Sequence, residues 1–426
     1  MPGTHIVGFP YFPGTATGRL HRGTSVSGDT ALCIVMLSQH EIIFFKGHAA
    51  GLIIVEAAPF SHSMIGLLGF GLPTVLISTK QAEQLGAGIE LVIDGSSGVI
   101  TDTLDAISPA VDNNSLLQPG QALLMADGEP VDLCASIRQA DSARQAFVLG
   151  ARSIGLVRSE FLSTEHDQIP DTEFYQHSFR QLCEAASGLS VTLRLLDVAA
   201  DKIPLWLPPL DSIGQPLGQQ GVRLYHSEPV RSIVDAQLSA VSILSTEFKL
   251  RVLIPYITRL EEYIYWLSQI RQRLPDNVAV GAMAETPASV LDVGHLLEDA
   301  DFVAIGCNDL MQSLYAADRD LAAQRHYLDP YAPVLYRLFR HVAEQAGIQL
   351  ARIQLCGLLP QIQGCLPVLL GLGYRTFSVD APFIPYLVQI IANTTQQKCE
   401  KLAQQVCAAR TTQQVLQILQ LPTDMH

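Results

Sequence analysis

Short apolar runs, separated by Gly, Pro, Ser and Asp, make up most of the first 110 residues. Examples are EIIFF, GLIIV, PTVLI and ELVID. β-Branched and apolar runs of this length, bounded by turn residues, are typical of strands. We therefore predict a small, strand-rich α/β domain over residues 1–110.

The pattern changes after a polar, turn-rich stretch that ends near residue 120. From there, strand-like runs alternate with longer amphipathic segments such as TEFYQHSFRQLCEAAS. Eight such runs follow in order: VDLCAS, SIGLVRS, VTLRLLDV, RVLIPYI, VAVGAMAE, DFVAIG, RIQLCG and YRTFSV. This alternation predicts a C-terminal (β/α)8 TIM barrel at residues 121–426, with residues 111–120 as a linker. A doubly wound open sheet is the alternative fold.

One apolar segment, residues 57–79, contains no Lys, Arg, Asp or Glu and is long enough to cross a bilayer. It also contains two prolines and three glycines. These turn signals favour a buried strand, a short helix and a further strand over a membrane helix.

The charge balance narrows the classes of partner. The chain has 27 Lys and Arg against 41 Asp and Glu, a net charge of -14, and no basic run. Binding to nucleic acid or to an anionic membrane is therefore not expected. Eight cysteines without a CxxC pair fit a reducing compartment. With no basic or apolar signal region at the N-terminus, we expect a cytoplasmic protein.

Polar residues gather where the predicted barrel strands end, which is where such barrels place their active sites. Glu285 and Asp309 follow neighbouring strands and could bind Mg²⁺, which prefers oxygen ligands. Cys356 could protonate an enolate, because a thiol is a suitable acid near neutral pH. Arginines from the same rim could clamp a phosphate or carboxylate: Arg158, Arg194 and Arg319.

Each of these residues also has a structural interpretation. An acid at a strand end often caps a helix, and an isolated cysteine in a strand is usually part of the core. His62, in PFSHSM, could be a loop histidine bonded to Ser61 or Ser63. It could equally be a nucleophile at a helix N-terminus, where the helix dipole would stabilise a phosphorylated imidazole.

Taken together, the motifs resemble the phosphoenolpyruvate-utilising enzymes, and among them Enzyme I, the phosphoenolpyruvate-protein phosphotransferase of the sugar phosphotransferase system. The similarity covers nearly the whole chain. The motifs that carry it follow in the family's order: VGFPYFPGTATGRL, SHSMIGLLGFGLP, GARSIGLVRSEFL, LRLLDVAADK, GAMAETPAS, DFVAIGCNDLMQSLYAADR and LCG.

The resemblance implies a role for each matching residue. His62 matches the phosphorylated histidine of a swivelling domain, and Cys356 matches the cysteine that protonates the enolate. Glu285 and Asp309 match the two Mg²⁺ ligands. The matching substrate-binding residues are Arg158, Arg194, Asn308 and Arg319. The implied reaction moves phosphate from phosphoenolpyruvate to His62 and releases pyruvate, and the implied assembly is a homodimer formed through the barrel.

The sequence departs from the family around the phosphohistidine. Phe60 replaces a threonine, Leu68 an arginine, Gln220 a substrate-clamp arginine and Leu358 an acid. Ala199 and Ala200 replace a pair of glycines. These changes motivate an alternative function, a regulatory or degenerate member that binds phosphoenolpyruvate or another 2-oxo acid with little or no turnover. A barrel lyase or aldolase that acts on a pyruvate enolate is a third possibility.

Two features separate the chain from ordinary Enzyme I. The opening strand passes to EIIFFKG within about 25 residues, which leaves no room for the helical insertion that docks the carrier protein HPr. The linker region contains Pro109, which would break a long connecting helix. The phospho-acceptor is therefore expected to be a protein other than HPr, docked in another way.

Overall fold

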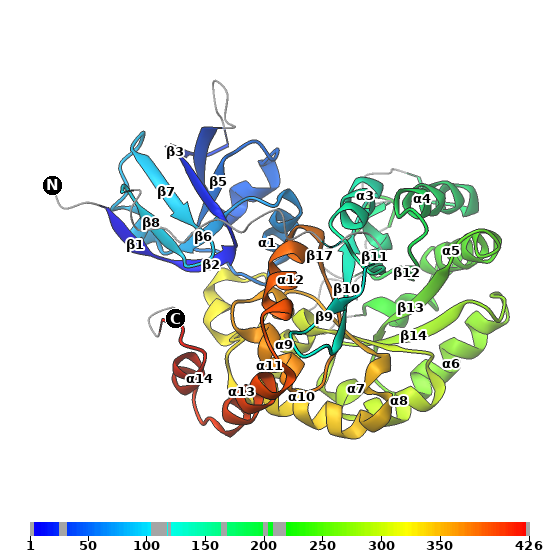
Figure 1. Cartoon of the computed structure of the whole chain (residues 1–426). Coiled ribbons are helices and arrows are strands. Elements are labelled where there is room, and N and C mark those ends of the chain that lie inside the picture. Colours follow the sequence, from blue (N-terminus) through cyan, green and yellow to red (C-terminus); the bar gives the residue numbers. More distant parts are fainter. Residues whose placement is uncertain are drawn as a thin grey trace.

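A computed structural model describes residues 4–24, 32–103, 117, 121–162, 168–198, 203–207 and 219–422. Two sheets organise these residues, a smaller N-terminal one and a C-terminal barrel (Figure 1). Apart from Leu117, the predicted linker at 111–120 lies outside the described residues, as do Pro109, Ala199 and Ala200.

The N-terminal sheet contains eight strands in the order β1-β8-β7-β3-β4-β5-β6-β2. Its strands are β1 (His5–Val7), β2 (Phe9–Phe12), β3 (Thr15–Arg22), β4 (Cys33–Ser38), β5 (Gly51–Val55), β6 (Thr74–Ile77), β7 (Glu90–Asp94) and β8 (Val99–Thr101). The charge-free segment 57–79 contains α1 (His62–Leu67), a 3-10 turn and β6, which confirms the expected short helix and the strand after it. The buried strand expected at the start of the segment lies just before it, as β5, which ends at Val55. No described helix is long and apolar enough to span a membrane.

The C-terminal sheet is a closed barrel of parallel strands, which confirms the predicted TIM barrel. Its strands are β10 (Pro130–Ile137), β11 (Ile154–Arg158), β12 (Val191–Arg194), β13 (Leu250–Ile257), β14 (Ala279–Ala284), β15 (Val303–Gly306), β16 (Ile353–Cys356) and β17 (Thr376–Asp380). The first strand, β10, pairs in parallel with both β11 and β17. This pairing closes the ring and excludes the open doubly wound sheet. The short β9 (Leu123–Leu124) pairs antiparallel with β10.

Helices surround the barrel on its outer side (Figure 1). They are α3 (Ala140–Val148), α4 (Thr172–Ala185), α5 (Val230–Leu244), α6 (Leu260–Arg271), α7 (Pro287–Leu291), α8 (Val293–Asp299), α9 (Cys307–Tyr315), α10 (Pro333–Ala346), α11 (Cys365–Gly371), α12 (Ile384–Ala392) and α13 (Gln396–Ala408). The last helix, α14 (Thr412–Ile418), packs against α13. The N-terminal domain has one further short helix, α2 (Thr79–Ala82). Buried tyrosines link helices to strands: the Tyr263 hydroxyl in α6 donates to the carbonyl of Val280 in β14 at 3.0 Å.

The N-terminal sheet rests on the C-terminal mouth of the barrel through a small set of contacts. Phe12 packs edge-on against Phe383, with ring centroids 4.6 Å apart, and the Tyr386 hydroxyl donates to the carbonyl of Pro13 at 3.3 Å. Glu56 forms an ion pair with Arg325 of the 3-10 helix Ala322–Tyr327, which follows α9. These contacts hold α1, which begins at His62, over the strand ends of the barrel.

Candidate active site

His62 is the first residue of the six-residue helix α1. Ser61 caps this helix, because its hydroxyl accepts the backbone N–H of Met64 at 3.3 Å. Ser61 has extended backbone angles, φ −65° and ψ 154°, which end the preceding loop and start the helix. The cap therefore fixes the position on the N-terminal domain from which the His62 side chain projects.

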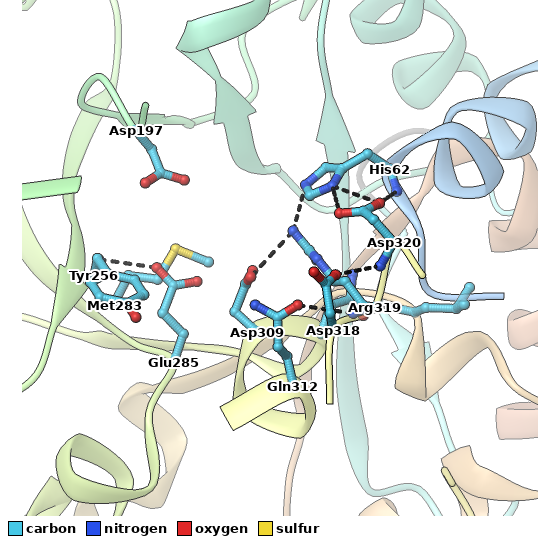
Figure 2. Close-up of polar contacts among 12 residues, drawn as sticks. His62, Asp197, Tyr256, Met283, Glu285, Asp309, Gln312, Asp318, Arg319 and Asp320 are labelled. Atoms are coloured by element: carbon cyan, nitrogen blue, oxygen red, sulfur yellow. Dashed lines mark hydrogen bonds and ion pairs between the residues drawn. The ribbon is translucent and has the colours of Figure 1, made fainter. Parts of the chain in front are cut away.

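The His62 imidazole is held by two residues of the barrel (Figure 2). Its Nδ1 lies 3.1 Å from Oδ2 of Asp320, and its backbone N–H donates to Oδ1 of the same carboxylate at 2.9 Å. Its Nε2 contacts the Arg319 guanidinium. A guanidinium only donates, so Nε2 accepts that bond and Nδ1 carries the ring hydrogen that is donated to Asp320. The contacts therefore select one neutral tautomer, with the Nε2 lone pair turned toward the barrel.

The loop after α9 is fixed by its own hydrogen bonds (Figure 2). The Arg319 N–H donates to Gln312 Oε1 at 3.0 Å, and the Asp320 N–H donates to Asp318 Oδ1 at 2.9 Å. Burial raises the pKa of Asp320, but the hydrogen bonds from His62 and the positive charge of nearby Arg319 outweigh it and leave this pKa below its ordinary value. Asp320 is thus an anion that faces the imidazole.

Two carboxylates stand beside this loop. Asp309 Oδ1 lies 3.2 Å from Arg319 Nη2. Glu285 is only 1% exposed, and its Oε1 accepts the backbone N–H of Tyr256 at 3.0 Å. A Cβ on Gly306 would lie 2.5 Å from Glu285 Oε2, so glycine is required there to leave room for the carboxylate.

The donor set is compatible with Mg²⁺. Among the residues the structure describes, no three His, Cys, Asp or Glu side chains form a metal-binding group. Mg²⁺ does not need such a cage, because it is usually held by one or two carboxylates and completes its shell with water and substrate oxygens. Glu285 and Asp309 supply hard oxygen donors of that kind.

The two remaining arginines differ in how their charge is balanced. Arg194 is buried between Glu160 and Asp197, the latter at 2.8 Å, and these carboxylates raise its pKa against the effect of burial. Arg158 forms no ion pair with any other described residue. Burial, followed by the charges of Arg138 and Arg194, lowers the pKa of Arg158 to about 10. It therefore remains a cation at neutral pH that would gain from an incoming anion.

Cys356 and Asn308 close the floor of the site. Burial raises the pKa of Cys356 to about 11, and Gln354 donates to its sulfur at 3.0 Å. Asn308 Oδ1 accepts the backbone N–H of Leu358 at 3.0 Å. Gly357 lies between them with φ +112°, where a Cβ would come 2.9 Å from Asn308 Oδ1. Cys356 is thus a protonated thiol at neutral pH, on a turn that Asn308 holds.

Nearly all residues singled out from the sequence surround one cavity at the C-terminal mouth of the barrel. The cavity measures about 20 Å³, enough for one water-sized group. Its predicted members are His62, Arg158, Arg194, Asn308, Asp309, Arg319 and Cys356. Glu285 lies against Gly306, which also lines it.

Sequence reasoning missed Asp320. This carboxylate accepts hydrogen bonds from both the backbone N–H and the Nδ1 of His62. Its only sequence signal was its place directly after Arg319 in AADRD. The departures from the family are largely apolar core: Phe60, Leu68 and Leu358 are all buried. Gln220 borders the site, where its side chain hydrogen-bonds with Tyr256.

Comparisons with known proteins place the chain among related sequences. The family model for the PEP-utilising enzyme, PEP-binding domain, matches residues 114–396. Multiphosphoryl transfer protein 2 of Escherichia coli (strain K12) is 29% identical over 402 residues, which cover 88% of this chain and 47% of that protein.

Two further relatives carry the name phosphoenolpyruvate-protein phosphotransferase. The protein of Staphylococcus carnosus is 27% identical over 396 residues, 88% of this chain and 69% of its own length. The protein of Bacillus subtilis is 26% identical over 377 residues, 84% of this chain and 66% of its own length. The chain therefore spans between about half and about two thirds of the relatives it matches.

Proposed function

The chain belongs to the PEP-utilising enzymes, and from that premise we propose that it transfers phosphate from phosphoenolpyruvate to His62 with release of pyruvate. The observation that supports this most is the position of His62 in the barrel mouth, with Nε2 against Arg319 and Nδ1 on Asp320. A nucleophilic imidazole needs a free lone pair on one nitrogen and a hydrogen on the other. The contacts hold His62 in that form.

In the proposed step, the bond between phosphorus and the enol oxygen breaks while a bond from phosphorus to Nε2 forms. Arg319 would release Nε2 and donate instead to the transferred phosphate, with Arg158 and Arg194 on the other oxygens. Asp320 would keep its bond to Nδ1 and stabilise the positive charge that develops on the ring.

The enolate of pyruvate that remains needs a proton at its terminal carbon. Cys356 lines the same cavity and carries a proton at neutral pH, because its pKa is raised to about 11. We propose that this thiol delivers the proton and that the thiolate regains one from solvent.

Glu285 and Asp309 are the residues that would hold Mg²⁺. When bound, this ion would neutralise charge on the substrate phosphate and carboxylate. Glu285 is the more rigid of the two, since Tyr256 fixes one of its oxygens.

A second candidate function has its own support. Gln220 stands where the family has a clamp arginine, and the cavity around Cys356 is small with His62 inserted. A member that binds phosphoenolpyruvate or another 2-oxo acid without transferring phosphate would have both features. The downstream acceptor and a homodimer formed through the barrel remain predictions under either function.

Labelling decides between the two functions. The chain is incubated with phosphate-labelled phosphoenolpyruvate and Mg²⁺, and acid-labile label on the protein is counted. Label that is lost in His62→Ala but kept in His295→Ala, a surface histidine paired with Asp292, is the expected result. Binding of phosphoenolpyruvate without any label would overturn phosphotransfer and favour the regulatory function.

A further inference from the structure

A second cavity opens at the opposite end of the barrel from His62. It measures about 600 Å³, within the roughly 300–1,000 Å³ of small-molecule sites. Its walls are the starts of β10, β13, β16 and β17 and the loops that precede β11, β12 and β15. The proposed reaction uses none of these residues.

This cavity is cationic in a chain whose net charge is -14. Its charged lining consists of four cations and two carboxylates: Arg152, Lys249, Arg251, Arg352, Asp132 and Asp301. We refer to this cavity as the cationic basin. Converging cations with few balancing acids are the usual sign of an anion site.

Two of the four cations form hydrogen bonds or ion pairs with other residues of the fold. Arg152 Nε lies 3.5 Å from Asp132 Oδ1. Arg352 donates to the carbonyls of Leu297 at 2.9 Å and Asp301 at 3.1 Å, which closes the C-terminal end of α8. Their charges are therefore partly balanced by groups of the protein itself.

Lys249 and Arg251 differ from that pair. Neither side chain forms a hydrogen bond or an ion pair with another residue in the described ranges. The Arg251 guanidinium stacks on the ring of buried Phe302, 3.6 Å from its centroid. This stacking fixes the orientation of the Arg251 guanidinium. Its N–H groups, which lie in the guanidinium plane, can still donate to the oxygens of a bound anion. Hydroxyl donors complete the lining: Ser153, Ser190 and Thr376.

The basin is separate from the candidate active site. One buried cluster inside the barrel separates them: Leu156, Leu253, Met283, Phe302, Ala304 and Cys356. Phe302 lines the basin, whereas Leu156, Met283 and Cys356 line the cavity at His62. Gln354 reinforces this cluster, since its amide donates to the carbonyl of Gly155 and to Cys356. A ligand in the basin therefore cannot reach His62, and its binding can be measured without any assay of phosphotransfer.

We propose that the cationic basin binds the dianionic phosphate group of a small metabolite. Lys249 and Arg251 supply two uncommitted positive charges, which match a phosphate dianion better than a single carboxylate. The volume leaves room for an organic part as well as the phosphate. The proposal does not rest on the function assigned to His62.

Acetylation of Lys249 provides a local test. Lys249 is exposed, as are Lys46, Lys80, Lys398 and Lys401, which serve as internal standards in the same sample. Mass spectrometry follows acetylation of the full chain in inorganic phosphate, in glucose 6-phosphate, in malonate and in potassium chloride at equal ionic strength. We expect phosphate to slow acetylation at Lys249 alone, by roughly tenfold at saturation. A lower effective concentration for the sugar phosphate would identify an ester as the ligand.

Variants locate the effect. Arg251→Gln should remove the protection, whereas Arg273→Gln, the same change in a surface arginine paired with Asp235, should keep it. Arg251→Lys should retain part of it. Equal protection by chloride, or protection by malonate but not by phosphate, would overturn the proposal. The wild-type comparison of phosphate with chloride decides the question even if Arg251→Gln does not fold.

Discussion

A carboxylate from the barrel domain contacts His62. Asp320 lies 3.1 Å from Nδ1 and also accepts the His62 backbone N–H. It therefore fixes both the ring orientation and the tautomer with a lone pair on Nε2, the atom that attacks phosphorus in the proposed reaction. The family threonine replaced by Phe60 could have bonded near this ring, so Asp320 supplies a polar contact from another direction.

Asp320→Asn keeps the size of the side chain and removes its charge. We expect the rate of His62 phosphorylation to fall by roughly 10²–10⁴-fold, since the amide can stabilise the wrong tautomer and cannot stabilise the imidazolium. Single-turnover labelling measures this rate. Asp292→Asn is the matched control, because it alters another Asp–His pair on the barrel surface. Equal rates in wild type and Asp320→Asn would show that the contact only supports docking.

Gln220 offers a gain-of-function prediction. Gln220→Arg restores the charge at the position where the family has an arginine, next to Tyr256. One charge-assisted hydrogen bond to the substrate is worth about 1.5–3 kcal/mol, so kcat/KM for phosphoenolpyruvate should rise roughly 10- to 150-fold. Gln219→Arg adds the same charge one residue earlier and should have little effect. A fall in kcat/KM for Gln220→Arg would mean that Gln220 has its own role.

A Cys356 variant distinguishes the two steps of the proposed reaction, which are phosphate transfer to His62 and protonation of the enolate. Cys356→Ala should leave single-turnover labelling of His62 near the wild-type rate and slow pyruvate release by roughly 10²–10⁴-fold. The pKa of about 11 means that the thiol loses its proton only as the pH rises toward that value, so this step should not weaken between pH 7 and 9. Cys183→Ala, another buried cysteine, is the control. Unchanged pyruvate release would assign the proton to another donor.

At the scale of elements, the interior of the barrel is packed where β10, β11 and β17 meet. Gly155 in β11 faces this seam. An added Cβ would lie 2.7 Å from Ser378 Oγ and 2.8 Å from Cys134 Cβ, closer than normal contacts. Ser378 is also within 2.9 Å of the Ser136 hydroxyl, so it cannot move without breaking that bond. Any side chain at this position would therefore have to displace its neighbours.

Gly155→Ala should therefore lower the free energy of unfolding by about 1–3 kcal/mol through overpacking. Urea denaturation measures it as a lower midpoint with an unchanged slope. Gly69→Ala is the control: its Cβ would meet no heavy atom within 4 Å, and the change should stay within about 0.5 kcal/mol. If the Gly155→Ala midpoint equals that of wild type, then β10 and β17 can shift to make room for the added methyl group at no cost in stability.

The alternation of strands and helices was enough to predict the barrel elements. The run VDLCAS became β10 and RIQLCG became β16. Alternation could not decide between a closed and an open sheet, because closure depends on the pairing of β10 with β17, which lie far apart in sequence. The contact between His62 and Asp320 spans 258 residues and depends on how the two domains dock. No local pattern encodes such a contact.

At the scale of the whole molecule, the candidate active site exists only while the N-terminal domain is docked. Two carboxylates carry polar contacts across the interface. Asp320 faces His62 and Arg319, and Glu56 faces Arg325. Burial raises the pKa of Glu56, but hydrogen bonds from Arg325 and the Thr79 N–H outweigh it, so this pKa is also below its ordinary value.

These shifts fix the sign of a pH dependence. A carboxyl whose pKa is lower in the docked state stabilises docking above its undocked pKa, and that stabilisation is lost as the pH falls through the docked pKa. Ordinary values are 4.5 for Glu56 and 3.8 for Asp320, so docking should weaken as the pH falls below about 4.5. Small-angle X-ray scattering should then show a larger radius of gyration while far-UV circular dichroism remains that of the folded chain.

The double variant Glu56→Gln and Asp320→Asn tests whether these two groups are responsible. It should be more extended than wild type at pH 7 and should change little on acidification, because both titrating groups are gone. Asp292→Asn should follow the wild-type curve, since Asp292 lies away from the interface. If the wild type keeps its radius of gyration until the barrel itself unfolds, the apolar contacts of Phe12 with Phe383 and Tyr386 hold the domains together without help from the charges. His62 would then remain in the barrel mouth at any pH at which the protein is folded, and release of the phosphorylated histidine would require the substrate or the acceptor to separate the domains.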